Sequence, residues 1–411
     1  MKRILCLVLA LCMVLALCAC GSTSTASTET ASTTTEAAAE TTTASGDNVI
    51  KIGIFEPASG DNGAGGKQET LGIRYANSVV PTVTIGGEEY TIELVEVDNQ
   101  SSTDKAVSAA QSLVSSEVSV VLGTYGSGCA IAAAPYFEEA GIPAIGASCT
   151  NPAVTETNPY YFRVCFLDPF QGSVMANFAA DEFGAKTAYV LYMLGEDYGS
   201  GLATYFIKAF EGLGGTVIEE SFPEGTSDFS AYIQNAVAGG ADFIFAPSAT
   251  TYASLIIGQA ASAGVTIPIA AGDTWESSVI LDAQNGTGLD VYCSTFFDEN
   301  DDSGLAKDFV SGFKAWLNED SQRLTNNGGN DIVAAVSALG YDAYMTAIEA
   351  IKLADSADGD AIQAALYNVD FEAVTGQITI NPDTGDANKT EAFIKQANDG
   401  AFDFVKRQSA E

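Results

Sequence analysis

The sequence contains no histidine and few basic residues. Its 411 residues include 17 Lys and Arg against 53 Asp and Glu, so the formal net charge is −36. Without histidine the chain lacks the commonest general base, the usual activator of a serine nucleophile and the commonest zinc ligand. The shortage of Lys and Arg argues against a nucleic-acid partner, because a phosphate-binding surface needs a basic stripe. The composition therefore favours a binding role over most enzymatic ones.

Recognisable metal and nucleotide motifs are also missing. Cys129, Cys149, Cys165 and Cys293 have no CxxC spacing and stand among apolar or small residues, which predicts small buried side chains. The glycines at 63–66 lack the third glycine of a dinucleotide fingerprint, and we expect them to permit a close backbone approach to a ligand or between lobes. We expect no metal and no cofactor.

The apolar run at the N-terminus is shorter than the roughly 20 residues that a membrane-spanning helix needs. Residues 1–3 carry two positive charges, residues 4–17 are apolar, and Leu17-Cys18-Ala19-Cys20 ends the run. This ending resembles a bacterial lipobox, which implies a lipoprotein signal peptide over 1–19 and a lipid on Cys20. Cys18 fits less well because the large Leu17 precedes it. An uncleaved membrane helix is the alternative.

Residues 20–47 have almost no branched aliphatic residues and no aromatic ones. Ser, Thr, Ala and Glu predominate, and such a segment cannot bury enough apolar surface to fold. We interpret it as a disordered tether that holds a folded body off a membrane.

The body alternates short apolar segments with amphipathic ones. Expected strands at 50–55, 91–97, 118–122 and 142–145 are separated by expected helices at 68–80, 103–116 and 130–140. A second series has strands at 187–192, 216–221, 242–246 and 267–271, with helices at 172–183, 199–211, 228–237 and 251–263. Further helices are expected at 307–318, 332–354 and 360–367, and strands at 376–380, 392–395 and 402–405. This pattern predicts an α/β fold with two doubly wound lobes and mostly parallel sheets.

We expect a hinge of three chain crossings, near Asp168, Ser294 and Gly376. The first lobe would then comprise residues 48–168 and 295–376, and the second lobe residues 169–294 and 377–411. Several crossings permit the two lobes to close on each other while they restrict other relative movements of the lobes.

Two loops in the first lobe carry hydroxyls where such folds bind anions. Ser127 follows the expected strand at 118–122, and Thr150 follows the one at 142–145. Loops at the carboxyl ends of parallel strands line a ligand crevice, and helix N-termini there attract negative groups. Alternatively, Ser127 only caps a helix and Thr150 only starts an Asn-Pro turn.

The order and spacing of several short segments extend over the body. They are the stretches 52–60, 121–123 with Ser127, 141–145, 149–152, 162–163 with Asp168 and 171–172, 196–199 and 271–274. Together they resemble the substrate-binding proteins of ABC importers, in particular the leucine/isoleucine/valine-binding type with the class I periplasmic-binding-protein fold. The resemblance implies capture of an amino acid in an interlobe cleft by a non-enzymatic, monomeric lipoprotein outside the cell. Its partners would be permease subunits and a cytoplasmic ATPase.

The resemblance also implies roles for individual residues. The ligand carboxylate would meet Ser127 and Thr150, with the backbone of Ser148 and Cys149 in reach, and the ligand ammonium would meet Asp273. The expected pocket walls are Tyr125, Tyr198, Trp275, Ser248, Thr250, Tyr341, Ser59 and Ala64. Other small carboxylates or amides, and sensing through a separate signalling protein, remain alternatives.

Overall fold

The computed structural model describes residues 48–301 and 304–410. The expected signal peptide over 1–19, the tether over 20–47 and the lipidation site Cys20 lie outside these residues. The folded body contains two separate main sheets, so the two-lobed α/β prediction is confirmed. We call the part around each sheet the first and the second lobe.

The first sheet is parallel except at one edge. Its strands run in the order β2 (Thr82–Ile85), β3 (Glu88–Asp98), β1 (Val49–Glu56), β4 (Val120–Leu122), β5 (Ala144–Gly146) and β6 (Tyr161–Arg163), with β2 antiparallel to β3. The helices of this part of the chain are α1 (Gly63–Val79), α2 (Thr103–Ser115) and α3 (Ser127–Glu139). Strand β1 is mostly apolar and lies between β3 and β4. The strand order runs outward in both directions from this pair, so the loops after β1 and β4 leave the sheet where the order reverses. Such a point is where doubly wound sheets bind ligands.

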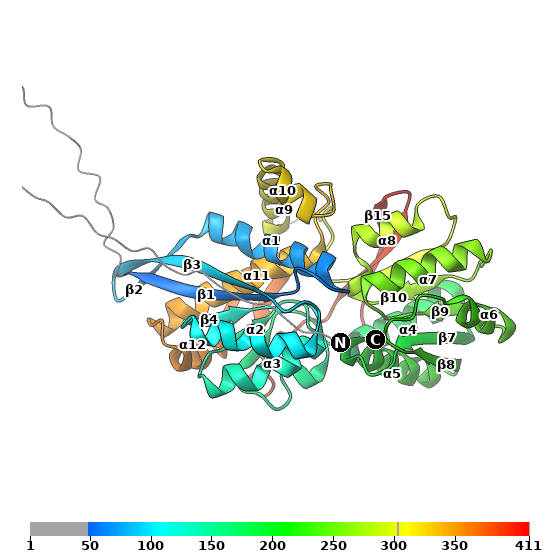
Figure 1. The fold of residues 1–411 in the computed structure, drawn as a ribbon, viewed down its shortest axis with the longest axis horizontal. Helices are drawn as coiled ribbons and strands as arrows, with labels where there is room; N and C mark the ends of the chain where they lie inside the picture. The colour runs from blue at the N-terminus through cyan, green and yellow to red at the C-terminus, as the bar shows by residue number, and fades with distance from the viewer. Residues whose placement is uncertain (1–47, 302–303, 411) are drawn as a thin grey trace, which may run out of the picture. The chain divides into compact units, whose positions relative to one another are not determined.

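The second sheet repeats this arrangement and adds two antiparallel strands. Its order is β15 (Ala401–Gln408), β14 (Ala392–Asn398), β11 (Val291–Thr295), β10 (Ile269–Ala271), β9 (Phe243–Phe245), β7 (Thr187–Met193) and β8 (Thr216–Phe222). The accompanying helices are α4 (Asp168–Phe183), α5 (Asp197–Gly212), α6 (Ser230–Ala238), α7 (Thr250–Ser262) and α8 (Ser278–Gln284). Figure 1 shows these helices grouped around strands β7 to β10.

The later part of the chain returns to the first lobe. It forms α9 (Gly304–Asn318), α10 (Ser321–Asn326), α11 (Ala335–Ala354), α12 (Gly359–Leu366) and a hairpin of β12 (Asp370–Ala373) with β13 (Gly376–Thr379). Helix α11 packs along α1, and both belong to one apolar core (Figure 1).

One expected hinge crossing lies later than predicted. After β13, Asp386 still bridges to Arg163 of β6, and Ala387 bridges to Ile380. Strand β14 of the second sheet then begins at Ala392. The crossing expected near Gly376 therefore lies at about residues 388–391, because Arg163 holds this stretch of chain beside the first sheet. The boundary predicted at residue 376 moves with this crossing, and those at residues 168 and 294 stay predictions.

Within the described part of the chain, no helix is long and apolar enough to cross a membrane. Cys129, Cys149, Cys165 and Cys293 are buried free thiols, as expected of small core residues.

Candidate functional site

Loops from both sheets enclose a small cavity at the carboxyl ends of their strands. The first lobe contributes the loops after β1, β4 and β5, and the second lobe contributes the loop after β10 and the start of α5. The lining residues are Asn62, Tyr125, Gly126, Ser127, Ser148, Tyr198, Asp273 and Thr274. Five of the predicted site residues are therefore brought together: Tyr125, Ser127, Ser148, Tyr198 and Asp273.

The loops of the two lobes touch directly around this cavity. The Tyr125 hydroxyl donates to the carbonyl oxygen of Thr274 at 3.3 Å, and the Asn151 side-chain amide donates to the carbonyl of Asp197 at 2.7 Å. Thr250 donates to the carbonyl of Asp61 at 3.0 Å. The enclosed volume is about 10 Å³, roughly the room of one water molecule. An amino acid can enter only if these contacts open.

Asp273 is the acidic group of the cavity. It follows β10, and its Oδ1 accepts hydrogen bonds from Gln171 Nε2 at 2.8 Å and from the Tyr198 hydroxyl at 3.1 Å. Gly272 makes this possible, because a Cβ there would lie 2.4 Å from the Tyr198 hydroxyl. Burial raises the pKa of Asp273 to about 6, against the opposing effect of these hydrogen bonds. No basic side chain of the described residues pairs with it.

Ser127 offers a hydroxyl hydrogen to the cavity. It is the first residue of α3, and the residue in the capping position is Gly126, so Ser127 is not the helix cap. Its Oγ accepts from the backbone N–H of Asn151 at 3.2 Å, which leaves its own hydrogen free to donate. The N–H groups of the first turn of α3 lie beside it, as at any helix N-terminus. A negative group is favoured at this end of the cavity.

Thr150 is buried and is not among the residues that line the cavity. Its Oγ1 is buried and has no hydrogen-bond partner of good geometry. The Thr150 hydroxyl nevertheless opposes the rise that burial causes in the pKa of the Asp168 carboxyl. The turn that follows is capped by Asn151, whose side chain accepts from Ala153 N–H at 2.9 Å. The hydroxyl of Thr150 is therefore not needed to form the turn.

Ser148 and Cys149 can meet a carboxylate only through their backbone. The Ser148 hydroxyl donates to Glu69 Oε2 at 2.5 Å, so its hydrogen is already used. The Cys149 carbonyl accepts from Arg163 at 2.8 Å, and burial raises the pKa of its thiol to about 12. Neither side chain donates to the cavity.

Six predicted wall residues are not in the cavity lining. Trp275 and Ser248 are buried in the second lobe, where Trp275 belongs to the apolar core and Ser248 donates to the Ala246 carbonyl at 3.1 Å. Thr250 forms the interlobe contact with Asp61 instead. Tyr341 stands on α11, and its ring packs against Tyr75 and Phe309 because this face of the helix is turned toward other aromatic side chains.

The remaining two lie in the loop and helix after β1. Ser59 is exposed and donates to Asp98 Oδ2 at 2.7 Å, which stiffens the loop. Ala64 is half-buried in the first turn of α1. The neighbouring Gly65 permits a close approach, but to Tyr125: a Cβ at Gly65 would lie 2.4 Å from the Tyr125 ring. This glycine therefore permits a close approach within the first lobe, and contact of the glycine cluster with the ligand stays a prediction.

Several contributors to the site were not predicted from the sequence. Asn62 and Thr274 line the cavity, and Gln171 holds Asp273 in place. Arg163 is buried and donates to the carbonyls of Cys149 and Asn151, at 2.8 and 2.7 Å, and to Asp386 at 2.5 Å. Its charge in an otherwise apolar stretch, 161–166, was the available signal for a residue that fixes the loop after β5.

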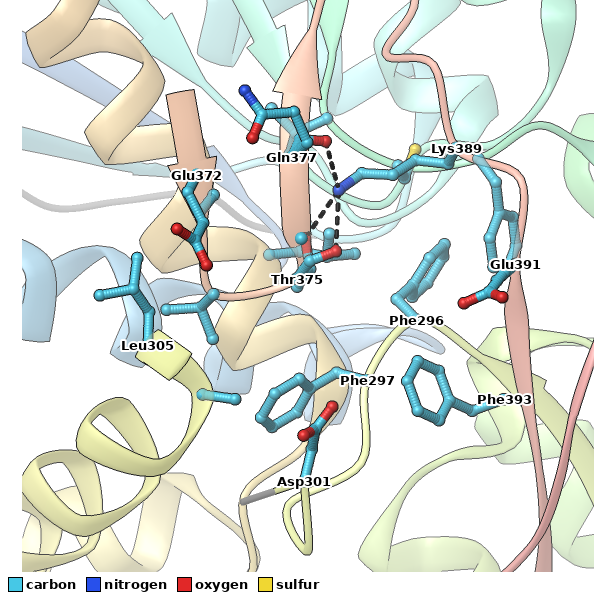
Figure 2. A pocket seen from close by; sticks show the side chains of 18 of the residues that line it. Phe296, Phe297, Asp301, Leu305, Glu372, Thr375, Gln377, Lys389, Glu391 and Phe393 are labelled. Carbon is cyan, nitrogen blue, oxygen red and sulfur yellow. Dashed lines mark hydrogen bonds between the residues drawn. The ribbon is translucent and has the colours of Figure 1, made fainter. Parts of the chain in front are cut away.

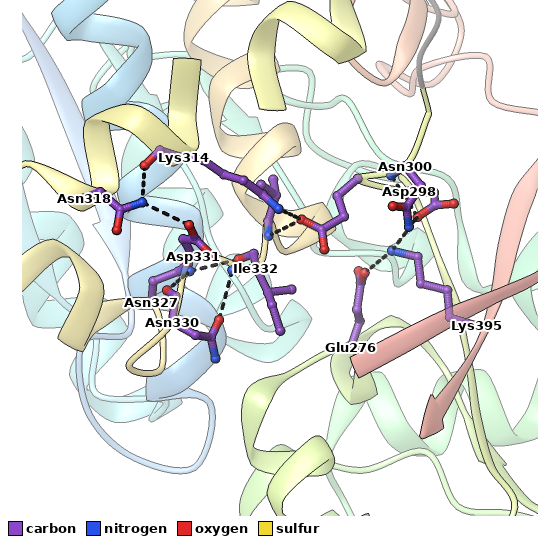
Figure 3. Close-up of polar contacts among 12 residues, drawn as sticks. Glu276, Asp298, Asn300, Lys314, Asn318, Asn327, Asn330, Asp331, Ile332 and Lys395 are labelled. Atoms are coloured by element: carbon purple, nitrogen blue, oxygen red, sulfur yellow. Dashed lines mark hydrogen bonds and ion pairs between the residues drawn. The ribbon is translucent and has the colours of Figure 1, made fainter. Parts of the chain in front are cut away.

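A buried ion pair lies close to Asp273 along the chain. Lys395 of β14 contacts Glu276 at 2.5 Å and Asp298 at 3.7 Å (Figure 3). Glu276 also accepts from the Thr295 hydroxyl at 2.5 Å and from the N–H of Ala335 at 3.1 Å. Since Ala335 begins α11, this pair ties the second sheet to a first-lobe helix.

A larger cavity, of about 390 Å³, lies among the segments that connect the lobes. Figure 2 shows Phe296, Phe297 and Phe393 in its wall, with Lys389 donating to Thr375 and to the carbonyl of Gln377. Arg407 pairs with Asp301 at 3.0 Å. Lys389 and Arg407, the cationic side chains that line this cavity, are thus already bound to other groups of the protein. This cavity shares no lining residue with the cavity around Asp273.

Comparison with protein families decides the class of the molecule. A family model described as a periplasmic binding protein matches residues 49–401, nearly the whole described body. The chain belongs to this family. It is thereby a substrate-binding protein of the ABC-importer class, acting outside the cytoplasm, and the family resemblance seen in the sequence is confirmed.

Two related proteins show the range of this similarity. A Leu/Ile/Val-binding protein homologue from Brucella abortus is 27% identical, and the match covers 81% of this chain and 88% of that protein. An amino acid binding protein from Pseudomonas aeruginosa is 31% identical, over 53% of this chain. The chain spans 58% of the length of that relative.

Solved structures of the same class share the fold. The leucine-binding protein LivK from Thermotoga maritima is 31% identical with a TM-score of 0.80, covering 88% of this chain and 99% of that one. LivJ from Streptococcus pneumoniae, in complex with isoleucine, is 29% identical with a TM-score of 0.76, covering 87% and 99%. A Rhodopseudomonas palustris solute-binding protein in complex with 3,4-dihydroxybenzoic acid is 23% identical with a TM-score of 0.75, covering 89% and 98%, and shows the fold alone.

Proposed function

We propose that this binding protein captures an aliphatic amino acid of the branched-chain class between its lobes and presents it to an ABC permease. The ligand carboxylate is received by the Ser127 and Thr150 hydroxyls, the N-terminus of α3 and the backbone N–H groups of Ser148 and Cys149. The ammonium is received by Asp273. Tyr125 and Tyr198 enclose the ligand, and the related proteins that carry leucine and isoleucine in their names support the aliphatic class.

The observation that carries this proposal is the placement of Asp273. A carboxylate that is 2% exposed and lacks a basic partner in the described residues is costly to keep charged. An incoming ammonium supplies that partner. Ser127 lines the same small cavity from the other lobe, so one zwitterion can meet both groups once the loops have parted enough to make room for it.

The same geometry argues against a ligand without an amine. A plain carboxylate, such as a benzoate, would use Ser127 and the α3 N-terminus but would leave Asp273 buried without a cation. Binding of such a ligand would also bring two negative groups into one closed cavity, which is unfavourable. We therefore propose that a carboxylate with an adjacent amine is preferred.

The setting of the protein completes the proposal. We propose a monomer, anchored by a lipid on Cys20, that hands its ligand to permease subunits driven by a cytoplasmic ATPase. Proteins of this family bind without catalysis, and we propose that this chain is likewise not an enzyme. Sensing through a separate partner would use the same site.

The test is a thermal-shift screen of the purified protein against the twenty amino acids and a set of small carboxylic acids. A ligand at 100 times its Kd stabilises the folded state by about 2.7 kcal/mol, which is readily seen as a rise in Tm. We expect branched-chain amino acids to give the largest rises. Stabilisation by carboxylic acids alone, with none by any amino acid, would overturn the proposal.

A further inference from the structure

Two buried acids stand behind the first-lobe wall of the cavity. Glu56 ends β1, and its Oε2 accepts from the N–H of Tyr125 at 2.8 Å. Glu69 lies on α1, and its Oε2 accepts from the Ser148 hydroxyl at 2.5 Å. Glu56 is 2% exposed and Glu69 is fully buried. No basic side chain of the described residues forms an ion pair with either one.

The two carboxyls influence the ionisation of one another. The Oε1 atom of each has no hydrogen-bond partner, and each carboxyl shifts the pKa of the other. Carboxylate oxygens only accept, so two of them can bond only when a proton lies between them. Burial raises the pKa of both groups, that of Glu56 well above its usual range and that of Glu69 to about 7. Glu56 therefore keeps its proton near neutral pH, and the pair carries one negative charge once the pH rises above about 7 and Glu69 ionises.

The side chains that line the cavity differ in whether they can donate or accept hydrogen bonds. The Ser148 hydroxyl donates its hydrogen to Glu69, and the Tyr198 hydroxyl donates its hydrogen to Asp273. Thr274 donates to the carbonyl of Ser248 at 3.0 Å, so it too offers only lone pairs. Ser148, Tyr198, Asp273 and Thr274 can therefore only accept hydrogen bonds from a ligand, whereas Ser127 has a hydrogen to donate.

We infer that Glu69, acting through the Ser148 hydroxyl, is the first-lobe half of the ammonium site, facing Asp273 of the second lobe. This inference rests on the proposed function, because it concerns the amine of the same amino-acid ligand. An ammonium has three N–H groups, which is enough to donate to an acceptor from each lobe. Glu69 is a positioning residue: it fixes the direction of the Ser148 hydroxyl and adds negative charge behind it. The amine then contacts both lobes, whereas the carboxylate is received by the first lobe.

The test compares Glu69→Gln with the matched variant Glu56→Gln. Each amide keeps the hydrogen bond that Oε2 accepts, since its oxygen replaces that atom, and its NH₂ can donate to the remaining carboxyl. The two variants differ only in where the negative charge is left. The probe is the amino acid that binds the wild-type protein most tightly in a calorimetric panel, together with the same compound lacking its amine.

We expect Glu69→Gln to weaken the amino acid at least about tenfold, the scale of one charge-assisted hydrogen bond. The des-amino compound should change by less than about twofold on the same scale. Glu56→Gln, which leaves Glu69 charged, should bind the amino acid as well as the wild type or better. Equal effects of the two variants on the amino acid, or equal weakening of both ligands by Glu69→Gln, would overturn the inference. If the wild type binds no amino acid, the proposed function itself fails; the inference fails separately only through the variants.

Discussion

At the scale of single residues, the site depends on polar side chains that are buried without the counter-charge they need. Asp273 has two hydrogen-bond donors but no cation, and Ser127 has a hydrogen to give. Such groups cost stability in the absence of a ligand and gain it when one binds. Sites of this kind hold perturbed pKa values, which makes them sensitive to pH.

The pKa of Asp273 leads to a prediction about affinity. Asp273 must be charged to hold an ammonium, and its pKa of about 6 means that it takes up a proton as the pH falls through 6. Affinity for the amino acid should therefore be full well above pH 7, where Glu69 is charged too, and lower by at least about tenfold at pH 5, since one pKa unit below the midpoint leaves about a tenth of Asp273 ionised. Calorimetry from pH 5 to 8 measures this. A flat profile for the wild type would contradict the assignment.

Sequence reasoning found these residues where their position was the signal. Ser127 lies in the loop after an apolar strand, and the end of a parallel strand places a side chain in the crevice. Asp273 was expected at the site only because of the family resemblance. Glu69 and Gln171 could not be found this way, because they lie within helices on buried faces. Their roles depend on Ser148 and Asp273 across the fold, 79 and 102 residues away in the chain.

At the scale of elements, the long and periodic segments were predicted well. The helices α1, α5 and α11 and the strands β1 and β7 lie where the pattern placed them, with ends shifted by a few residues. Strand β6 and helix α10 were missed because three- and six-residue elements leave almost no periodic signal. Tyr341 was expected in the cleft, but its ring lies where α11 packs against α1 and α9. The sequence of α11 does not reveal this packing.

The buried pair of Lys395 and Glu276 gives a prediction for the element that joins the lobes. Lys395→Met should lower the free energy of unfolding by about 3–5 kcal/mol, because Glu276 would remain charged and buried without its partner. Chemical denaturation measures this. Lys406→Met, at a half-buried lysine of the neighbouring strand β15, is the matched control and should change stability by less than about 0.5 kcal/mol. Similar losses in the two variants would show that the pair has no special role.

At the scale of the whole molecule, two lobes with loops that meet at one cavity suit a protein that opens and closes. Among the described residues, four hydrogen bonds join the loops of the two lobes around the cavity: Tyr125 to Thr274, Asn151 to Asp197, and Thr250 and Thr251 to Asp61. Each is worth only about 0.5–1.5 kcal/mol. Separating the loops at this edge therefore costs little free energy, whereas the chain crossings between the sheets keep the lobes together.

The proposed lipid anchor is tested at this scale. We expect the protein expressed with its full N-terminus in a bacterial host to incorporate a radiolabelled fatty acid and to sediment with membranes. Cys20→Ser should abolish both, and Cys18→Ser should leave both unchanged, because the expected cleavage places Cys20 first in the mature chain. Labelling that survives in Cys20→Ser and is lost in Cys18→Ser would move the anchor to Cys18.

The central claim is that Asp273 receives the amine of an amino acid held between the lobes. The most direct measurement is calorimetric titration of the wild type, Asp273→Asn and the control Asp282→Asn with the best-binding amino acid. Asp282 is an exposed acid on α8 of the same lobe. We predict that Asp273→Asn loses at least about 2 kcal/mol, roughly thirtyfold in Kd, while Asp282→Asn binds as the wild type does. Unchanged affinity in Asp273→Asn would contradict the account.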